Sequence, residues 1–366
     1  MIKILLIVGT RPNFVKLAPL FHRLRDAGRF GLTVCHTGQH FDTNMSDAFW
    51  SCLELPRPDF DLKVNGTSAV SAIGKTIVAV SKILEQNRFD LAIVFGDVNA
   101  TLAGAIASVQ SGIKLMHVEA GLRSFDRRMP EEINRLMTDQ ISDFLMVSEE
   151  SGLENLRREG VDDRRIFFVG NIMIECLLKT QAKWRTIRLS SQLQDVMGEK
   201  FVLATFHRPE NVDGAENRQQ IIEILKGVSE RYRVVFPVHP RTKRKLCENM
   251  THSALAGNKR ILQLEPLGYF EFIKLLSQAT CVMTDSGGVQ EEAAFLKKPC
   301  VTFRNNTERP VTILRGTNKL LSLANPHFLE EIDRHVGAIH RMDLQPIPLW
   351  DEHVSQRIVD VILKHL

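Results

Sequence analysis

The chain has 366 residues, about two to three times a typical domain of ~150, so two domains are expected rather than one. Hydrophobic residues make up 44% and charged residues 25%, a balance that disfavours disorder, collagen-like repeats and coiled coil. The formal net charge of +4 is slight for this length. It gives no reason to expect a nucleic-acid partner, although it suits a protein that binds small anions.

The apolar start of the chain, residues 2–8, is too short to span a bilayer and lacks a signal-peptide cleavage site. No other apolar run approaches ~18 residues, so we expect no membrane segment. The six cysteines are scattered and contain no Cys-x-x-Cys pair. Free thiols in the reducing cytoplasm are therefore expected, with neither disulfides nor a zinc site.

Short apolar runs alternate with helix-length amphipathic segments along the whole chain. The expected strands are 2–8, 32–36, 91–95, 114–118, 144–147, 166–169, 201–206, 233–238, 261–264, 280–284 and 300–303. The expected helices include 12–27, 68–87, 99–111, 131–142, 216–231, 268–278 and 288–297. Strands that are apolar on both faces and joined by helices predict parallel sheets covered on both sides.

This alternation breaks near Gly170, where a polar helical stretch runs to about Glu199, and it restarts at Phe201. We therefore predict two doubly wound α/β domains, over residues 1–170 and 171–351. A closing amphipathic helix over 352–366 is expected to pack back on the N-terminal domain. The cleft between two such domains is the default ligand site.

The first strand runs into Gly9-Thr10-Arg11-Pro12, a sharp turn that opens a helix. Arg11 and Lys16 then lie near the N-terminus of that helix, at the carboxyl end of a strand. A phosphate or an acidic sugar group would fit there. A solvated pair of charges at an ordinary helix start is the alternative.

Carboxylates follow three elements of the predicted first domain. Asp97 follows strand 91–95, Glu119 follows strand 114–118, and Glu131 and Glu132 open a helix after Pro130. The carboxyl ends of parallel strands meet at one edge of a sheet, so these acids are expected to gather at the cleft. Clustered carboxylates suit general acid–base work. Helix capping by Asp97 and Glu131 is the alternative.

Strand 280–284 of the second domain runs into a turn of small residues before a helix. Ser286, Gly287 and Gly288 would let backbone N–H groups approach a diphosphate at the helix N-terminus. Glu292, one turn later, could reach a ribose diol, and Arg309 could add a cation. A capped helix after a glycine turn is an equally good explanation of the turn itself.

Two histidines follow equivalent strands of the second domain. His207 comes after strand 201–206 and His239 after strand 233–238, so both are expected to face the cleft. Neither belongs to a pair with metal-ligand spacing such as HExxH, and no metal site is predicted.

Taken in order, these segments resemble one family. They are Gly9-Thr10-Arg11-Pro12, Thr37-Gly38-Gln39-His40, Gly96-Asp97, His117-Val118-Glu119-Ala120-Gly121-Leu122-Arg123, Pro130-Glu131-Glu132-Ile133-Asn134-Arg135, Gly170-Asn171, Phe206-His207-Arg208, Pro237-Val238-His239, Thr284-Asp285-Ser286-Gly287-Gly288-Val289-Gln290-Glu291-Glu292 and Thr307-Glu308-Arg309-Pro310. The set resembles the non-hydrolysing UDP-N-acetylglucosamine 2-epimerases over essentially the whole chain.

The resemblance implies a GT-B architecture, with two Rossmann-like domains and the nucleotide sugar in the cleft between them. It also implies a cytoplasmic homodimer in polysaccharide biosynthesis that needs no cofactor. In the family reaction UDP leaves by anti elimination across C-1 and C-2, giving 2-acetamidoglucal. UDP then adds back with the opposite configuration at C-2, so that UDP-N-acetylglucosamine becomes UDP-N-acetylmannosamine.

Carried over motif by motif, the resemblance assigns three groups of residues. The catalytic group is Asp97, Glu119, Glu131 and His207. The substrate-binding group is Arg11, Lys16, Ser286, Gly287, Gly288, Glu292 and Arg309. A possible allosteric site for a second UDP-sugar comprises Gln39, His40 and His239.

The sequence departs from the common family text at Asn13-Phe14, where Glu-Ala is usual. Relatives that act on diacetamido uronic acid sugars carry Gln-Phe nearby, so the substituents at C-3 and C-6 of the sugar stay open. A hydrolysing 2-epimerase that releases free N-acetylmannosamine and UDP is a second alternative. A GT-B glycosyltransferase and a non-catalytic nucleotide-sugar binder are two more.

Overall fold

The chain folds into two compact units. The computed structural model describes residues 1–38, 49–64, 68–248, 255, 257–339, 341 and 344–366. The first unit comprises Met1–Thr180 together with Pro348–Leu366, and the second comprises Gln181–Ile347. The division thus falls after Thr180, whereas the sequence suggested Gly170, because the helix over Ile172–Lys179 packs against the first helix of the chain.

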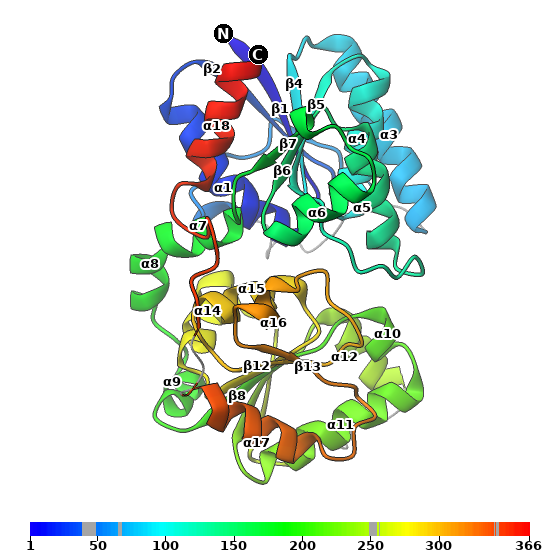
Figure 1. Cartoon of the computed structure of the whole chain (residues 1–366). Coiled ribbons are helices and arrows are strands. Elements are labelled where there is room, and N and C mark those ends of the chain that lie inside the picture. The colour runs from blue at the N-terminus through cyan, green and yellow to red at the C-terminus, as the bar shows by residue number, and fades with distance from the viewer. Residues whose placement is uncertain (39–48, 65–67, 249–254, 256, 340, 342–343) are drawn as a thin grey trace. The chain divides into compact units, whose positions relative to one another are not determined.

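The first unit is a parallel sheet with helices on both faces (Figure 1). Its strands are β1 (Ile2–Val8), β2 (Phe30–His36), β3 (Phe60–Asp61), β4 (Leu91–Phe95), β5 (Lys114–Ala120), β6 (Phe144–Val147) and β7 (Ile166–Phe168). Its helices are α1 (Arg11–Asp26), α3 (Ala69–Gln86), α4 (Asn99–Gln110), α5 (Pro130–Ile141), α6 (Glu150–Arg158), a 3₁₀ turn (Asp163–Arg165), α7 (Ile172–Lys179) and α18 (Val354–His365). The strand order is β3-β2-β1-β4-β5-β6-β7, and every neighbouring pair is parallel.

Strand β1 shows why this sheet is covered on both sides. Every residue from Ile4 to Val8 is at most 1% exposed, so neither face of the strand meets solvent. Leu5 and Ile7 lie in one apolar cluster with residues of α3 and α4. The intervening residues of the strand point to the opposite face, on the side of α1. The continuous apolar run in the sequence is therefore the signature of a central parallel strand.

The C-terminal helix α18 completes the first unit, packing against α1 and α7. The Ser355 backbone N–H and hydroxyl both donate to the fully buried carboxylate of Glu175, each at 2.5 Å. The segment before α18 passes so close to Gly170 that a Cβ there would lie 1.9 Å from the Leu349 carbonyl oxygen. Gly170 also has a φ of +89°, so this crossing requires glycine.

The second unit is likewise a parallel sheet between helices. Its elements are α8 (Gln181–Thr186), α9 (Ser191–Met197), β8 (Phe201–Thr205), α10 (Pro209–Val212), α11 (Ala215–Ser229), β9 (Arg233–Pro237), α12 (Pro240–Glu248), β10 (Ile261–Leu264), α14 (Tyr269–Gln278), β11 (Cys281–Thr284), α15 (Gly287–Phe295), β12 (Cys300–Thr302), α16 (Val311–Leu314), β13 (Asn318–Leu320) and α17 (Phe328–Ile339). Its strand order is β10-β9-β8-β11-β12-β13, and all pairs are parallel.

Alternation along β8 again divides the core between the two faces. Val202 and Ala204 belong to an apolar cluster with residues of α11 and α17. Phe201 and Leu203 belong to a second cluster with residues of α9, α14 and α15. Two Rossmann-like, doubly wound units, as the sequence predicted, are thus confirmed.

Both sheets reverse their strand order at an equivalent place. In the first unit β1 lies beside β4, and in the second β8 lies beside β11. Ligands of open α/β sheets bind outside the carboxyl ends of the strands at such switch points. A ligand site is therefore expected at the loops that follow these four strands.

Edge strands β3 and β13 were not predicted, because they are two and three residues long and carry Asp61, Asn318 and Lys319 among them.

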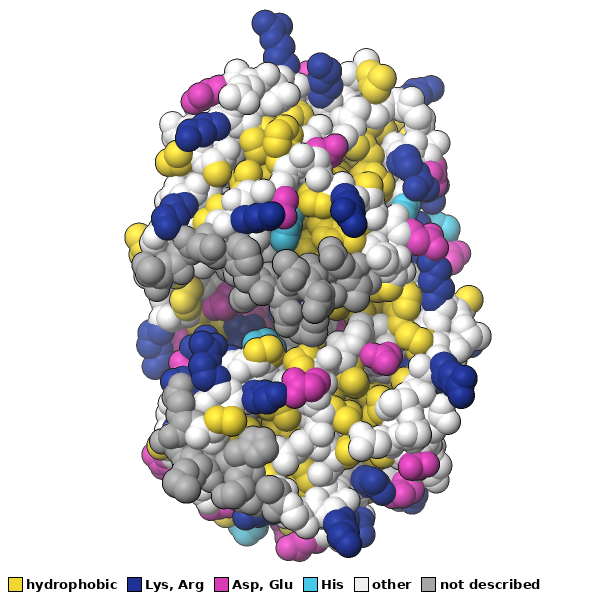
Figure 2. All heavy atoms as spheres, turned by 180° about the vertical axis from the view of Figure 1, so that it is seen from behind, with side chains coloured by type: hydrophobic (Ala, Val, Ile, Leu, Met, Phe, Trp, Pro, Cys, Tyr) yellow, Lys and Arg dark blue, Asp and Glu magenta, His cyan; other side chains and the backbone are white. Residues whose placement is uncertain are grey.

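In the part of the chain that the structure describes, no helix is both long and apolar enough to cross a membrane. On the face seen in Figure 2, basic and acidic side chains are interspersed.

Candidate active site

The loops after β1 and β4 are tied together by Asn13. Its side-chain oxygen accepts hydrogen bonds from the backbone N–H groups of Gly9 and Thr10, at 3.0 and 3.1 Å. Its side-chain nitrogen donates to the Phe95 carbonyl oxygen at 3.0 Å. Phe14 beside it is buried against the rings of His36 and Trp50. Asn13 and Phe14, where the sequence departs from the common family text, therefore hold the switch point together.

Two predicted site residues meet beside this switch point. The Lys16 amine on α1 forms an ion pair with the Glu119 carboxylate on β5, and both side chains are only 5% exposed. Gly96, in the turn after β4, leaves room for this pair, because a Cβ there would lie 2.7 Å from the Lys16 Nζ. Its φ of +65° also favours glycine.

Glu119 occupies an irregular position in the sheet. The register of β5 against β6 shifts between Val118 and Ala120, so Glu119 is the extra residue of a β-bulge. Its φ of +78° lies in the left-handed region, which non-glycine residues rarely adopt. The predicted strand ended at residue 118, whereas the structure continues it to Ala120 with Glu119 inside the bulge.

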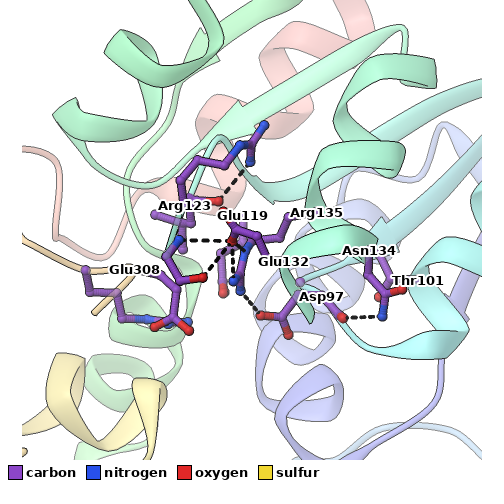
Figure 3. A network of polar contacts seen from close by, with 12 residues as sticks. Asp97, Thr101, Glu119, Arg123, Glu132, Asn134, Arg135 and Glu308 are labelled. Carbon is purple, nitrogen blue, oxygen red and sulfur yellow. Dashed lines mark hydrogen bonds and ion pairs between the residues drawn. The ribbon is translucent and has the colours of Figure 1, made fainter. Parts of the chain in front are cut away.

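Asp97, directly after the Gly96 turn, is held by residues of α5 (Figure 3). The Arg135 guanidinium, only 1% exposed, pairs with the Asp97 carboxylate through Nη1 and with Glu132 through Nη2, the latter at 2.7 Å. The Asn134 side chain donates to the Asp97 carbonyl oxygen at 2.9 Å. Helix α5 therefore fixes both the side chain and the backbone of Asp97.

Glu132 also fixes the loop that leads into α5. Its carboxylate accepts hydrogen bonds from the Ser124 backbone N–H and hydroxyl and from the Phe125 backbone N–H, at 2.9 to 3.0 Å. Glu131, which the sequence singled out, lies half-buried in the first turn of α5. Its neighbour Glu132 accepts hydrogen bonds from the Arg135 guanidinium, at 2.7 and 3.0 Å.

The Arg11 side chain lies at the start of α1. Its guanidinium carbon is 5.7 Å from the centre of the Phe49 ring, a cation–π distance. The structure thus places four predicted residues, Arg11, Lys16, Asp97 and Glu119, at the carboxyl edge of the β1, β4 and β5 strands.

A buried hydrogen-bonded pair, His117 and Asp139, lies beneath these loops. The His117 Nδ1 is 2.6 Å from an Asp139 carboxylate oxygen, and its Nε2 is 2.7 Å from the Gly96 carbonyl oxygen. Asp139 also accepts from the Gly121 backbone N–H at 3.0 Å and pairs with Arg123 at 2.7 Å. Burial alone raises the pKa of Asp139, but His117 and Arg123 hold that pKa below its ordinary value.

The switch point of the second unit is organised by Asp285, at the end of β11. Its buried carboxylate accepts hydrogen bonds from the backbone N–H groups of His207 and Arg208, each at 3.0 Å. The His207 Nδ1 lies 3.0 Å from the same carboxylate. Although burial raises the pKa of Asp285, His207 and these N–H groups keep it lowered. Asp285 thereby fixes the predicted residue His207 at the end of β8.

Arg309 lies against the N-terminus of α15. A Cβ on Gly287 would be 2.3 Å from the Arg309 Nη1, so glycine lets the guanidinium lie directly against the helix start. Arg309 also pairs with Glu291 at 2.9 Å and lies 3.4 Å from Glu308. With Ser286 as the N-cap and Gly287 and Gly288 in the first turn, this helix start combines N–H donors, the helix dipole and a cation. The arrangement can bind a diphosphate.

Glu292 is buried one turn further along α15. Burial raises the pKa of its carboxyl to about 8, the hydrogen bond with Tyr269 opposes that change, and Glu291 adds to it. At neutral pH the carboxyl is therefore largely protonated and can both donate and accept hydrogen bonds.

The predicted allosteric residues divide into two cases. His239 is exposed, and its ring centre lies 5.2 Å from that of His207. Gln39 and His40 lie outside the described residues. Among the described residues, no cluster of three or more His, Cys, Asp or Glu side chains is arranged to hold a metal ion.

Sequence reasoning named Glu132 beside Glu131 but missed the other buried polar residues that hold the predicted ones. These are His117, Arg135, Asp139 and Asp285. One signal was available, because Glu132, Arg135 and Asp139 follow one another at intervals of three and four and so share one face of α5. Charged residues on the buried face of a helix are rarely tolerated unless they are paired.

Comparison with known proteins identifies the family. A family model described as UDP-N-acetylglucosamine 2-epimerase matches residues 22–363. A UDP-N-acetylglucosamine 2-epimerase of Methanocaldococcus jannaschii is 41% identical over 324 residues, which are 87% of this chain and 88% of that protein. A UDP-2,3-diacetamido-2,3-dideoxy-D-glucuronate 2-epimerase of Pseudomonas aeruginosa is 37% identical over 339 residues, 92% of each chain.

A solved structure agrees with these relatives. The crystal structure of the M. jannaschii UDP-GlcNAc 2-epimerase in complex with UDP-GlcNAc and UDP superposes with a TM-score of 0.91 at 36% identity. The match covers 99% of this chain and 100% of that one. The expected GT-B fold class and the expectation of an epimerase are thereby confirmed. The chain belongs to the UDP-N-acetylglucosamine 2-epimerase family.

Proposed function

We propose that this enzyme reversibly converts UDP-N-acetylglucosamine into UDP-N-acetylmannosamine without releasing free sugar. One observation supports this most directly: Asp97 and Glu119 lie at the carboxyl ends of the adjacent strands β4 and β5, and each is paired with a buried cation. Two carboxylates held at fixed positions at one sheet edge suit the removal and return of a proton. Relatives that carry the same activity in their names support the choice of substrate.

In the first half of the proposed reaction, a carboxylate removes the proton on C-2 of the sugar. The electron pair of that C–H bond forms a double bond between C-1 and C-2. The bond between C-1 and the diphosphate oxygen breaks on the opposite face, and UDP leaves with its electron pair. The products held on the enzyme are 2-acetamidoglucal and UDP, and the base carries the proton.

In the second half, the diphosphate oxygen adds back to C-1, and a second carboxyl group on the other face gives its proton to C-2 and becomes a carboxylate. Asp97, Glu119 and Glu131 share these proton transfers. The Lys16 and Arg135 ion pairs keep Glu119 and Asp97 in place, which matters because proton transfer needs donor and acceptor within hydrogen-bond reach. Inversion at C-2 follows from using the two faces in turn.

The second unit binds UDP in this proposal. Ser286, Gly287 and Gly288 offer the N-terminus of α15 to the diphosphate, and Arg309 adds a positive charge there. Glu292 receives the ribose hydroxyls. His207 and Arg11 steady the negative charge that grows on the departing oxygen, the kind of stabilisation that contributes most when charge develops.

A modified UDP-sugar is a second candidate substrate, favoured by the similarity to the diacetamido-glucuronate 2-epimerase. The Asn13-Phe14 departure gives it no support, because Asn13 bonds backbone groups and Phe14 is buried among aromatic rings. The two substrates are therefore best compared side by side in the same assay.

Proton NMR in deuterated water tests the proposal. Purified enzyme is incubated with UDP-N-acetylglucosamine and, separately, with the UDP-diacetamido-glucuronate sugar. UDP-N-acetylmannosamine carrying deuterium at C-2 supports both the proposed product and the elimination route. Free sugar plus UDP would show the hydrolysing reaction instead. Turnover of the uronate sugar alone would favour the second candidate.

Substitution of the two carboxylates tests their roles. We expect Asp97→Asn and Glu119→Gln each to lower turnover by ~10²-fold or more, because a positioned acid–base group contributes about that much. The affinity for UDP should be retained in both. Glu154→Gln, an exposed change on α6 of the same unit, is the matched control. Near-normal turnover in both carboxylate variants would contradict the assignment.

The homodimer, the cytoplasmic location, the polysaccharide role and the allosteric residue His239 stay predictions. Light scattering of the purified enzyme measures its oligomeric state directly. A dependence of the rate of UDP-N-acetylmannosamine turnover on added UDP-N-acetylglucosamine, lost in His239→Ala, would support the allosteric site.

A further inference from the structure

The buried pair His117 and Asp139 has no part in the proton transfers proposed above. Both side chains are fully buried, at 0% exposure, in the first unit. Burying polar and ionisable side chains costs free energy unless their hydrogen bonds are well satisfied. The backbone segments that these hydrogen bonds fix therefore indicate what the pair does.

The pair lies beneath a strained segment of backbone. Glu119 is the bulged residue of β5, with a φ of +78°. A non-glycine residue persists in this region only when the surrounding structure forces it to. Some contact must therefore hold the chain on both sides of Glu119.

Asp139 makes both of those contacts. One carboxylate oxygen bonds the ring of His117, two residues before Glu119, at 2.6 Å. The other accepts from the backbone N–H of Gly121, two residues after it, at 3.0 Å. The Gly121 carbonyl is held in turn by Asn155 at 2.9 Å. A single carboxylate thus bridges the bulge from below.

His117 extends the same contact to the next loop. Its other ring nitrogen donates to the Gly96 carbonyl oxygen at 2.7 Å, and the Gly96 N–H donates to the Val118 carbonyl at 2.9 Å. Both polar backbone groups of Gly96 are therefore held by β5. Asp97 is the next residue along the chain, so its position depends on this anchor.

We infer that Asp139, acting through His117 and Gly121, is the positioning residue that sets Glu119 and Asp97 in register with each other for proton transfer. This inference rests on the proposed function of those two carboxylates. Because both side chains are fully buried, we assign neither His117 nor Asp139 a contact with the substrate. Their effect is geometric, and misplacement of a reacting group by about 1 Å can cost ~10²-fold in rate.

Asp139→Asn is the main test. Asparagine keeps the shape of the side chain, but it cannot accept hydrogen bonds from His117, Gly121 and Arg123 at once. We expect kcat to fall ~10- to 100-fold. The affinity for UDP, measured by calorimetry, should change less than about 3-fold, because Ser286, Gly287, Gly288, Glu292 and Arg309, which are proposed to bind UDP, belong to the second unit. His117→Gln, whose amide can reach only one of the two partners of the ring, should show the same split between kcat and UDP affinity.

Glu175→Gln is the matched control. Glu175 is also a fully buried carboxylate of the first unit, but its partners are Ser355 and Lys179, away from the loops after β4 and β5. It should lower the melting temperature while leaving kcat within about 2-fold. All rates are measured at a temperature at which circular dichroism shows each variant to be folded.

The outcomes separate the possibilities. A loss of kcat in Asp139→Asn and His117→Gln, with UDP affinity kept and the control active, supports the inference. If Asp139→Asn does not fold, His117→Gln decides the matter by the same readouts. A normal kcat in a folded Asp139→Asn variant overturns the inference. If that variant does not fold, a normal kcat in His117→Gln overturns it. A parent enzyme that exchanges no deuterium at C-2 would instead refute the proposed function.

Discussion

Replacing Glu292 by Gln should change how the stability of the protein depends on pH. Burial raises the pKa of this carboxyl from 4.5 to about 8 in the folded chain. At ~1.4 kcal/mol per pH unit, keeping it protonated over that interval corresponds to on the order of 5 kcal/mol. Glutamine has nearly the same shape, can still bond Tyr269, and cannot ionise.

The sign follows from the proton balance. Below the ordinary pKa of 4.5, Glu292 is protonated in both the folded and the unfolded chain, so it has no effect. As pH rises towards about 8, the unfolded chain has lost the proton while the folded one keeps it. The free energy of unfolding of the parent therefore falls over this interval. The Gln variant does not undergo this decrease, so its free energy of unfolding rises relative to that of the parent as pH rises.

Urea unfolding of the parent and of Glu292→Gln, followed between about pH 5 and about pH 9, measures this difference. Taking the difference at each pH cancels the titration of all other groups. Glu223→Gln, an exposed change on α11 of the same unit, serves as the control and should give a flat difference. A flat difference for Glu292→Gln as well would refute the reasoning.

Three further substitutions test other contacts. Arg309→Ala removes the cation at the start of α15 and should weaken UDP binding ~10- to 100-fold by calorimetry. Ser355→Ala removes a hydroxyl that bonds the buried Glu175 carboxylate and should lower the free energy of unfolding by ~1–3 kcal/mol in urea, with UDP affinity unchanged. Gly96→Ala places a methyl group 2.7 Å from the Lys16 amine and should lower kcat ~10-fold or more in the NMR assay.

Each of these has a result that contradicts it. Unchanged UDP affinity in Arg309→Ala would remove that residue from the anion site. Unchanged stability in Ser355→Ala would mean that water replaces the lost hydroxyl without cost. Normal turnover in Gly96→Ala would show that Lys16 can move without harm, and Gly74→Ala, in open space on α3, is the control for the added methyl group.

Much of the fold could be predicted from the sequence, because a strand buried on both faces appears as an uninterrupted apolar run. The run from Ile4 to Val8 is apolar throughout, and only a central parallel strand buries every residue in that way. The short edge strands β3 and β13 leave no such mark. Residues such as Asp61 and Lys319 look like loop residues, and only pairing with β2 and β12 makes them strands.

The candidate site was also predictable only in part. Asp97 could be placed because it follows a buried strand and a glycine, and parallel strands end at a common edge. The bulge at Glu119 could not, because it depends on how β5 meets β6 and on Asp139, far along the chain. A sequence reveals which residues follow a strand, whereas the partners that fix their side chains are set by tertiary contacts.

The return of α18 to the first unit has a consequence for how the chain folds during synthesis. The whole second unit, residues 181–347, is translated between α7 and α18. At ~5–20 residues per second this takes on the order of ten seconds. Throughout that time α1 and α7 lack the apolar cover of Val354, Ile358 and Ile362. The first unit can therefore bury its complete core only after the whole second unit has been translated.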